Sequence, residues 1–380
     1  MRLCQSLNLP WKRAEKALSA LWSRLRPGTD AADTDAAAAL PELPAENGKA
    51  PPIGLALQGG GAHGAFTWGV LDRLLEAGAF RFEAISGASA GALNAVVTAN
   101  GLLAKGPDAA REGLEAFWRS VSAKAAMMPY HPTLLDRMVS GWNQDGTGHQ
   151  LSLDIATRLV SPYQFNPLGH NPLRQILAES IDFEMLRRNR RLKLYIAATE
   201  ISTGRAKIFR TSQLSPDVLD ASTALPSIHH AVEIDGVHYW DGGYSANPPL
   251  IPLVEKAGCG DILLIQIEPP HEDGLPVTAT EIRTRLARLT FMAPLNRELD
   301  ALRWAEKMNG QSKNGAEPSS STVRLHRIDS GDALSPLGQF SKLNPEWGLL
   351  QHMRDIGREQ ADAWLSRKAA QVGVRTTFRV

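Results

Sequence analysis

Apolar and polar positions along residues 53–100 follow a pattern that predicts a strand, a glycine turn and a helix, repeated once. An apolar run over residues 53–57 ends at three consecutive glycines, and a segment with helical spacing follows them. A second run, residues 82–86, leads into a Gly-Ala-Ser-Ala-Gly turn at residues 87–91 and a helix-like segment over residues 92–100. Short apolar runs bounded by glycine are typical of buried strands. We therefore expect two neighbouring parallel strands, each followed by a glycine turn.

The rest of the chain alternates between helical and strand-like patterns, which predicts an α/β protein. Helical spacing covers residues 109–122, 172–180, 214–224, 280–308 and 347–365. Strand-like patterns cover residues 192–199, 206–210, 261–268 and 323–328. An Asp-Gly pair at residues 235–236 predicts a hairpin turn. We expect Pro294 to interrupt the long helix over residues 280–308, because proline lacks the N–H that a helix interior uses.

The N-terminal residues 1–26 carry a helical stripe of Leu and Trp beside six basic side chains and one acidic one, Glu15. A basic amphipathic helix of this kind is typical of a helix that lies on an anionic membrane surface. A helix that packs its stripe against the protein or a partner has the same pattern, so both readings stay open. Residues 27–52 are rich in Ala, Asp and Pro without a sustained pattern, which predicts a disordered linker.

The net charge, the number of cysteines and the lengths of the apolar runs argue against several classes of function. The chain has 380 residues, 43% hydrophobic, and a formal net charge of +1, which argues against nucleic acid as a partner. Its two cysteines, Cys4 and Cys259, form neither a disulfide framework nor a Cys-x-x-Cys metal site. The sequence shows neither a run long enough to span a membrane nor a secretory signal. We expect a cytoplasmic protein without metal or cofactor, with peripheral contact to the inner face of the membrane through residues 1–26 as the further hypothesis.

The turn at residues 87–91 has the Gly-x-Ser-x-Gly pattern around Ser89. A serine on a sharp strand-to-helix turn has its hydroxyl exposed, and small neighbours allow the chain to turn tightly. The first N–H groups of the following helix have no partner inside the helix, so they favour a developing oxyanion. A second glycine turn, Gly59-Gly60-Gly61, follows the neighbouring strand and would meet the first above the sheet edge. Together the two turns predict nucleophilic acyl chemistry at Ser89.

An acidic residue followed by two glycines, Asp241-Gly242-Gly243, comes directly after a predicted strand with an aromatic end. It is either a base for the serine or a turn aspartate that caps the next segment, and the pattern alone leaves both open. An aspartate with an ordinary pKa near ~3.9 is a poor base at neutral pH. Burial beside Trp240 and the sheet edge would raise that pKa and make proton transfer from Ser89 feasible.

These pieces resemble the patatin-like phospholipase family. The motifs that carry the resemblance are Gly59-Gly60-Gly61-Ala62-His63-Gly64, Gly87-Ala88-Ser89-Ala90-Gly91 and Asp241-Gly242-Gly243, with Ala221–Pro226 before the third. The resemblance implies a three-layer α/β/α sandwich with a mostly parallel central sheet. It also implies a catalytic domain over residues 53–268, followed by a mainly helical extension over residues 269–380, of a kind found in bacterial members, that packs on it.

The resemblance further implies a Ser–Asp dyad, with Ser89 as nucleophile and Asp241 as base. The oxyanion hole would come from the N–H groups of the first glycine turn, Gly59, Gly60, Gly61 and Ala62. Further motif residues would support these turns: His63, Gly64, Gly87, Gly91, Gly242 and Gly243. The family usually has Arg or Lys at the position of His63. If that cation stabilises the glycine turn or an anionic headgroup, we expect the charge here to titrate and to be weaker near neutral pH, which leaves the headgroup preference open.

The predicted activity is hydrolysis of carboxylic esters of lipids, of the phospholipase A or lysophospholipase kind, through an acyl-Ser89 intermediate. One alternative is an α/β-hydrolase triad, an esterase or polyester depolymerase, that uses His271, His326 or His352. Of these, His326 lies within a predicted strand, and the adjacent pair His229 and His230 comes too early in the chain. A dinucleotide site at residues 59–64 would need an acidic residue where Ser86 and Gly87 stand. A catalytically silent lipid-binding protein is the third alternative.

Overall fold

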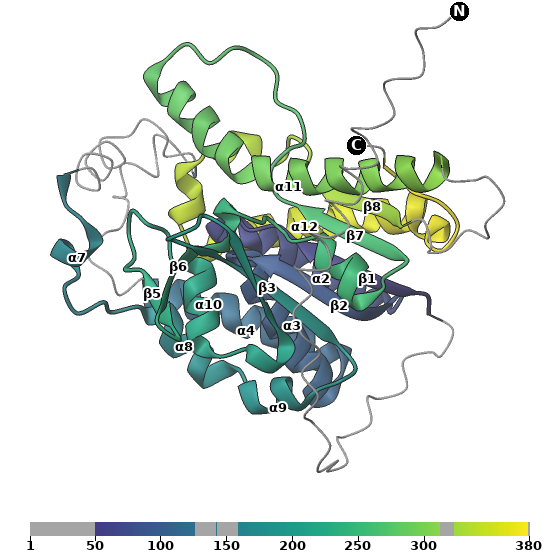
Figure 1. Cartoon of the computed structure of the whole chain (residues 1–380), viewed down its shortest axis with the longest axis horizontal. Helices are drawn as coiled ribbons and strands as arrows, with labels where there is room; N and C mark the ends of the chain where they lie inside the picture. The colour runs from purple at the N-terminus through teal and green to yellow at the C-terminus, as the bar shows by residue number, and fades with distance from the viewer. Residues whose placement is uncertain (1–49, 126–141, 143–158, 312–322, 379–380) are drawn as a thin grey trace, which may run out of the picture. The chain divides into compact units, whose positions relative to one another are not determined.

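The computed structural model describes residues 50–125, 142, 159–311 and 323–378 (Figure 1). The predicted helix over residues 1–26 and nearly all of the predicted linker lie outside the described residues. None of the helices in the described ranges is both long and apolar enough to cross a lipid bilayer.

Within the described ranges, eight strands form one sheet in the order β5-β6-β3-β2-β1-β7-β8, with β4 paired to β3. The parallel part comprises β1 (Pro52–Leu57), β2 (Arg81–Ala88), β3 (Lys193–Glu200), β7 (Asp261–Gln266) and β8 (Arg324–Asp329). The antiparallel part comprises β4 (Ala206–Arg210), β5 (Val232–Ile234) and β6 (Val237–Asp241), at the β3 side of the sheet. The predicted mostly parallel sheet is confirmed.

Helices cover both faces of this sheet, because successive strand residues point to opposite sides. Leu55 and Leu57 of β1 belong to a core that includes α2 (Gly64–Ala77), α3 (Ala90–Lys105), α4 (Pro107–Ala125) and α12 (Trp347–Lys368). Ala56, between them, belongs to a second core with α11 (Ala279–Gln311) and the π-helical segment η4 (Leu253–Ala257). Figure 1 shows α11 and α2 with the sheet between them. The predicted three-layer sandwich is therefore confirmed.

The shorter helices start at capping residues that the sequence supplies. They are α7 (Pro162–Phe165), α8 (Pro172–Ser180), α9 (Phe183–Arg188) and α10 (Pro216–Thr223). Before α10, Ser215 accepts a hydrogen bond from the N–H of Val218, and Pro216 occupies the first helical position, where its missing N–H costs nothing. Short 3₁₀ turns complete the described part: η1 (Gly61–His63), η2 (Thr211–Gln213), η3 (Gly242–Tyr244), η5 (Ser335–Leu337), η6 (Phe340–Leu343) and η7 (Ala369–Gln371).

The predicted hairpin turn at Asp235-Gly236 is confirmed. Both residues have positive φ, 52° and 78°, as a two-residue turn of the type that matches strand twist requires. The turn fixes the register of β6 against β5. β6 ends at Asp241, which pairs with Ala198 of β3.

The predicted interruption at Pro294 is wrong, because α11 runs without a break from Ala279 to Gln311 with Pro294 inside it. Pro294 is itself buried, and Met292, Leu295 and Leu299 around it are packed in the core beneath the sheet. This packing compensates for the one backbone hydrogen bond that proline removes. The C-terminal segment also supplies β8 to the central sheet and α12 to its layer of helices. The domain boundary between residues 268 and 269 stays a prediction.

Candidate active site

Ser89 occupies the sharp turn that the sequence predicted between a strand and a helix. β2 ends at Ala88 and α3 begins at Ala90. Ser89 itself has φ 53° and ψ −130°, a conformation that L residues rarely adopt and that stores strain of about 1–3 kcal/mol. The residue is 8% exposed. The strain is maintained by the surrounding fold, and it directs the hydroxyl out of the turn.

Strand register brings Asp241 to the same level of the sheet as Ser89. Ala88 pairs with Ala197 of β3, and Asp241 pairs with Ala198, the next residue of that strand. The segment at the end of α10 then links the two. The N–H of Ser89 donates to both oxygens of Ser222, each at 3.1 Å, and the N–H of Asp241 donates to the carbonyl of Ala224 at 2.9 Å. Residues distant in sequence are thus fixed against one short segment.

The carboxyl group of Asp241 is completely buried. Its Oδ1 accepts a hydrogen bond from the N–H of Gly243 at 2.7 Å. Its Oδ2 is buried and has no hydrogen-bond partner of normal geometry in the described part of the chain. Burial raises the pKa of Asp241 to about 7, although the nearby Ser89 hydroxyl and the Gly243 N–H each act to lower it. A carboxylate with one unoccupied oxygen, next to a hydroxyl, can accept that hydroxyl's proton near neutral pH.

The first glycine turn lies directly against Ser89. A Cβ added to Gly59 would come within 2.7 Å of the Ser89 Cβ and 2.6 Å of the Ala88 carbonyl oxygen, so only glycine allows this approach. The N–H of Gly59 donates to Asn247 Oδ1 at 2.7 Å and is therefore not available to a substrate. Gly61 has φ 59°, and its own approach to the Lys342 carbonyl, 2.3 Å from an added Cβ, also excludes a side chain.

The remaining N–H groups of this turn are unoccupied. Those of Gly60, Gly61 and Ala62 donate to no acceptor among the described residues, and the same holds for Ala90 and Gly91 at the start of α3. The other motif glycines allow close packing: an added Cβ would lie within 3.0 Å of a neighbouring atom at Gly64, Gly87, Gly91, Gly242 and Gly243. The site therefore presents two sets of free N–H donors.

His63 is buried, and its Nε2 lies 2.6 Å from Ser341 Oγ. Because the Ser341 hydroxyl donates to the Gly338 carbonyl at 2.7 Å, the hydrogen between His63 and Ser341 must come from His63 Nε2. Burial, helped by the nearby Lys342 charge, lowers the pKa of His63 to about 3. The expectation of a cation that titrates near neutral pH is therefore wrong, because the fold places this side chain away from water. His63 is neutral and structural.

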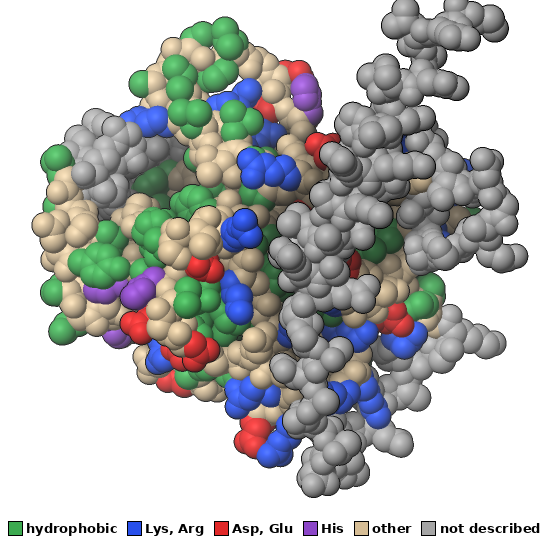
Figure 2. All heavy atoms as spheres, in the orientation of Figure 1, with side chains coloured by type: hydrophobic (Ala, Val, Ile, Leu, Met, Phe, Trp, Pro, Cys, Tyr) green, Lys and Arg blue, Asp and Glu red, His purple; other side chains and the backbone are tan. Residues whose placement is uncertain are grey.

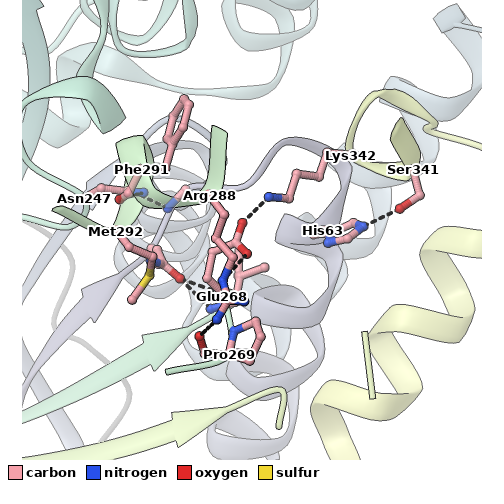
Figure 3. Close-up of polar contacts among 12 residues, drawn as sticks. His63, Asn247, Glu268, Pro269, Arg288, Phe291, Met292, Ser341 and Lys342 are labelled. Carbon is pink, nitrogen blue, oxygen red and sulfur yellow. Dashed lines mark hydrogen bonds and ion pairs between the residues drawn. The ribbon is translucent and has the colours of Figure 1, made fainter. Parts of the chain in front are cut away.

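Residues of the C-terminal segment hold the glycine turn in place (Figure 3). Lys342 pairs with the buried Glu268, which also lies 3.7 Å from Arg288 Nε of α11. Asn247 donates to the Phe291 carbonyl at 3.2 Å while it accepts from Gly59. Sequence analysis did not predict a role for Asn247, Ser341 or Lys342, because none of them lies in a motif. Their role becomes visible only in these contacts. Ser222, in contrast, lies in the segment 221–226, which is part of the family resemblance.

The late histidines have partners elsewhere. His326 is fully buried in β8 and lies 3.0 Å from Asp261 Oδ1. His271 pairs with Asp273 at 2.9 Å on the surface, and the His352 ring lies 4.7 Å from that of Trp142. In the described part of the chain, no hydrogen bond joins a histidine to Ser89 or Asp241. The geometry therefore offers a two-residue site.

A pocket of about 470 Å³ is lined by Val237, His238 and Trp240 of β6, together with nearby residues that include Glu200. Neither Ser89 nor Asp241 is among its lining residues. Within the described ranges, no group of three or more His, Cys, Asp or Glu side chains could hold a metal ion.

The sequence matches a known protein family. The family model described as Patatin-like phospholipase matches residues 55–254, which is 200 of the 380 residues. A search of curated proteins gives no match. Among solved structures, VipD from Legionella pneumophila is similar at 16% identity, 80% of this chain, 66% of its own length and a TM-score of 0.33.

A second similar structure contains ExoU, from the type III secretion system of Pseudomonas aeruginosa, in complex with SpcU. It has 15% identity, covers 82% of this chain and 53% of its own, and has a TM-score of 0.29. A further ExoU structure has 16% identity and a TM-score of 0.28. The chain thus spans between about half and two thirds of the length of these proteins.

Proposed function

The chain belongs to the patatin-like phospholipase family, and on that premise we propose that it hydrolyses carboxylic esters of lipids through an acyl-Ser89 intermediate, with Asp241 as the base. The observation that carries this proposal is the Asp241 carboxyl: it is fully buried, its pKa is raised to about 7, and its Oδ2 has no partner of normal geometry in the described chain. A phospholipase A or lysophospholipase activity fits such a site. No cofactor takes part in these steps.

In the first half of the reaction, Asp241 accepts the proton of Ser89 while the serine Oγ attacks the ester carbonyl. The carbonyl oxygen then carries the negative charge of the tetrahedral intermediate. The N–H groups of Gly60, Gly61 and Ala62 are free to hydrogen-bond this oxygen, and in other enzymes one such donor contributes roughly 2.7–4 kcal/mol. Gly59 drops out of the predicted set because Asn247 occupies its N–H. Collapse of the intermediate expels the alcohol, which takes the proton from Asp241.

In the second half, Asp241 removes a proton from water, and the resulting nucleophile attacks the acyl carbon of the Ser89 ester. The same N–H groups stabilise the second oxyanion. The serine leaves with the proton that Asp241 holds, and the fatty acid is released. Each half returns the carboxyl group to its starting state, so one base with a pKa close to neutrality can serve both.

The alternative of a Ser–Asp–His triad has little support, because the late histidines bind or contact other residues. Replacement of His271, His326 and His352 should therefore leave hydrolysis in place, apart from any loss of folded protein. Labelling with a serine-reactive probe distinguishes an enzyme from a catalytically silent lipid-binding protein.

A fluorophosphonate probe, which reacts with activated serines, tests the proposal directly. Wild-type protein should be labelled, Ser89→Ala should not, and Ser202→Ala, in an exposed turn, should be labelled as wild type. The labelling rate should increase as the pH rises through about 7, because the base is the ionised carboxylate. Folded wild-type protein that is not labelled would favour the silent lipid-binding protein, and labelling of Ser89→Ala would identify a different nucleophile.

A further inference from the structure

The ring of Phe291, in the first half of α11, lies against the turn that carries Asp241. Its Cε1 and Cδ1 atoms would come within 2.6 and 2.8 Å of a Cβ added to Gly243. The Asp241 Oδ1 would lie 3.0 Å from the same Cβ. The aromatic ring and the carboxyl oxygen therefore border the space of one missing methyl group, and only glycine at position 243 allows the ring to approach this closely.

Phe291 lies between this turn and the solvent. Asp241 is fully buried, whereas Phe291 is half-buried, so one part of its surface faces the turn and another part faces outward. The ring also packs on Tyr244 of the same turn, with ring centroids 4.9 Å apart. Figure 2 shows the part of α11 before Pro294 at the surface of the molecule. The ring thus closes the turn from its outer side.

The apolar cluster within the sheet at this turn consists of small side chains. Its buried members are Ala88, Ala197 and Ala246. Gly242 lies so close to β3 that an added Cβ would be 2.1 Å from the Ala197 carbonyl oxygen. Methyl groups allow the strand ends to approach one another, but each covers little surface, whereas a phenyl ring buries roughly 150–250 Å². The large apolar side chain at this position comes from outside the sheet, from α11.

Main-chain and side-chain contacts fix Phe291 in its place. Its carbonyl accepts a hydrogen bond from Asn247 Nδ2 at 3.2 Å. The next residue, Met292, is buried, and its sulfur accepts a hydrogen bond from Gln58 Nε2 at 3.3 Å. Gln58 directly precedes Gly59, whose N–H donates to Asn247, and Figure 3 shows Phe291, Met292 and Asn247 together. One turn of α11 therefore contacts two of the three turns that form the candidate site.

Burial, and not a charged neighbour, controls the Asp241 carboxyl. Burial raises its pKa to about 7, and the two groups that lower this pKa are the Ser89 hydroxyl and the Gly243 N–H, neither of which carries a charge. Tyr244 is the titratable side chain on the same turn, and its own pKa is raised by burial and by the charge of Asp241. A change in water access at the turn will therefore act directly on this carboxyl.

The charged side chains of α11 on either side of Phe291 have other partners. Arg288 is buried against Glu268, and Glu298 accepts hydrogen bonds from the N–H groups of residues 250–251.

The residues of β3 and α10 that contact the Asp241 main chain do not titrate; they are Ala198, Thr199 and Ala224.

We propose that Phe291 is a positioning residue of the candidate active site, whose ring covers the turn of Asp241 and keeps water away from its carboxyl group. This inference rests on the proposed function, in which Asp241 is the base. A carboxyl group shielded from water accepts the proton of Ser89 near neutral pH, and the ring preserves this property without contact with the reacting atoms. Phe291 lies outside residues 55–254, which match the family model, so the C-terminal segment contributes to the base.

The pH dependence of fluorophosphonate labelling tests the proposal in the full chain. In Phe291→Ala, the midpoint of the labelling rate should move from about 7 to lower pH by at least about one unit, because water at the carboxyl favours its charged form. Phe291→Leu keeps an apolar cover and should stay within about half a unit of wild type. Leu289→Ala, at an exposed position of the same helix, is the matched control and should not move the midpoint. A wild-type midpoint in Phe291→Ala would overturn the proposal.

Urea unfolding examines the same carboxyl without any reaction. Between about pH 5 and about pH 8.5, the stability gained by Asp241→Asn should grow about a hundredfold in the unfolding equilibrium constant. In a Phe291→Ala background it should grow only about tenfold, because a pKa one unit lower makes ionisation of Asp241 less costly. A Leu289→Ala background should keep the full growth. The cavity left by Phe291→Ala costs the same at both pH values, so equal growth in all backgrounds would overturn the proposal even if this variant is less stable.

The two measurements separate this proposal from its premise. If wild-type protein is not labelled but the Phe291→Ala background reduces the growth in stability, the proposed function fails and the ring still shields the carboxyl. If wild-type protein is labelled, and Phe291→Ala changes neither the midpoint nor the growth, the proposed function stands and the role of the ring fails. A change in Phe291→Ala confined to the KM of a long-chain ester would make the ring a wall of the acyl site and would also contradict the proposal.

Discussion

Replacing Asp241 by Asn removes a carboxyl group that the fold buries completely. Burial raises the pKa of this group from 3.8 to about 7. The folded protein therefore holds a proton that the unfolded chain releases, and the stability gained from this is fully present below about pH 3.8 and lost as the pH rises through about 7. An asparagine of the same shape does not ionise, so it avoids this loss.

The magnitude follows from the difference between the two pKa values, which is about 3. At about 1.36 kcal/mol per pKa unit, the ionised carboxyl costs on the order of 4 kcal/mol above neutral pH. At about pH 5 the folded protein keeps its proton and only the unfolded chain ionises. The loss of stability is therefore smaller there, on the order of 2 kcal/mol. Asp241→Asn should therefore gain on the order of 2–3 kcal/mol in stability over wild type between about pH 5 and about pH 8.5.

Urea denaturation of both proteins at these two pH values measures the effect, with equal m-values as the condition for comparison. The amide in place of Oδ2 has its own cost, but that cost is the same at both pH values and cancels. Asp300→Asn, at an exposed position of α11, is the matched control and should show little difference. A stabilisation that does not change with pH would show that Asp241 is not a carboxyl group with a raised pKa, and the argument for it as a base would fail.

Two further predictions concern the turns around Asp241. Ser89→Gly should be more stable than Ser89→Ala by about 1 kcal/mol in thermal unfolding, because Ser89 has φ 53° and glycine adopts this conformation without strain. At the control position Ser120, within α4, the glycine variant should be less stable than the alanine variant. The same order at both sites would contradict strain at Ser89. Asn247→Ala should lower kcat at least about tenfold with KM little changed, because Gly59 loses its anchor and the N–H donors beside it lose their fixed position. The exposed Asn296→Ala is its control, and a change confined to KM would contradict this role.

The sequence determined the local parts of this protein. Glycine turns after apolar runs, helical spacing and an Asp-Gly pair depend on neighbouring residues only, so the two strand–turn–helix units and the hairpin before Asp241 were predicted from residues that lie side by side in the chain. The family resemblance also gave the three-layer fold. The catalytic roles of Ser89 and Asp241 stay predictions. The fold places the two side chains close enough for the Ser89 hydroxyl to lower the pKa of Asp241.

The tertiary structure alone decided the properties that depend on burial and on distant partners. It gave Asp241 its raised pKa and made His63 neutral, because both effects come from desolvation by residues far along the chain. It assigned the N–H of Gly59 to Asn247, and it kept α11 continuous through Pro294 by packing the helix on the sheet. Local sequence fixes conformation through adjacent atoms, whereas electrostatics and packing depend on which segments fold against each other.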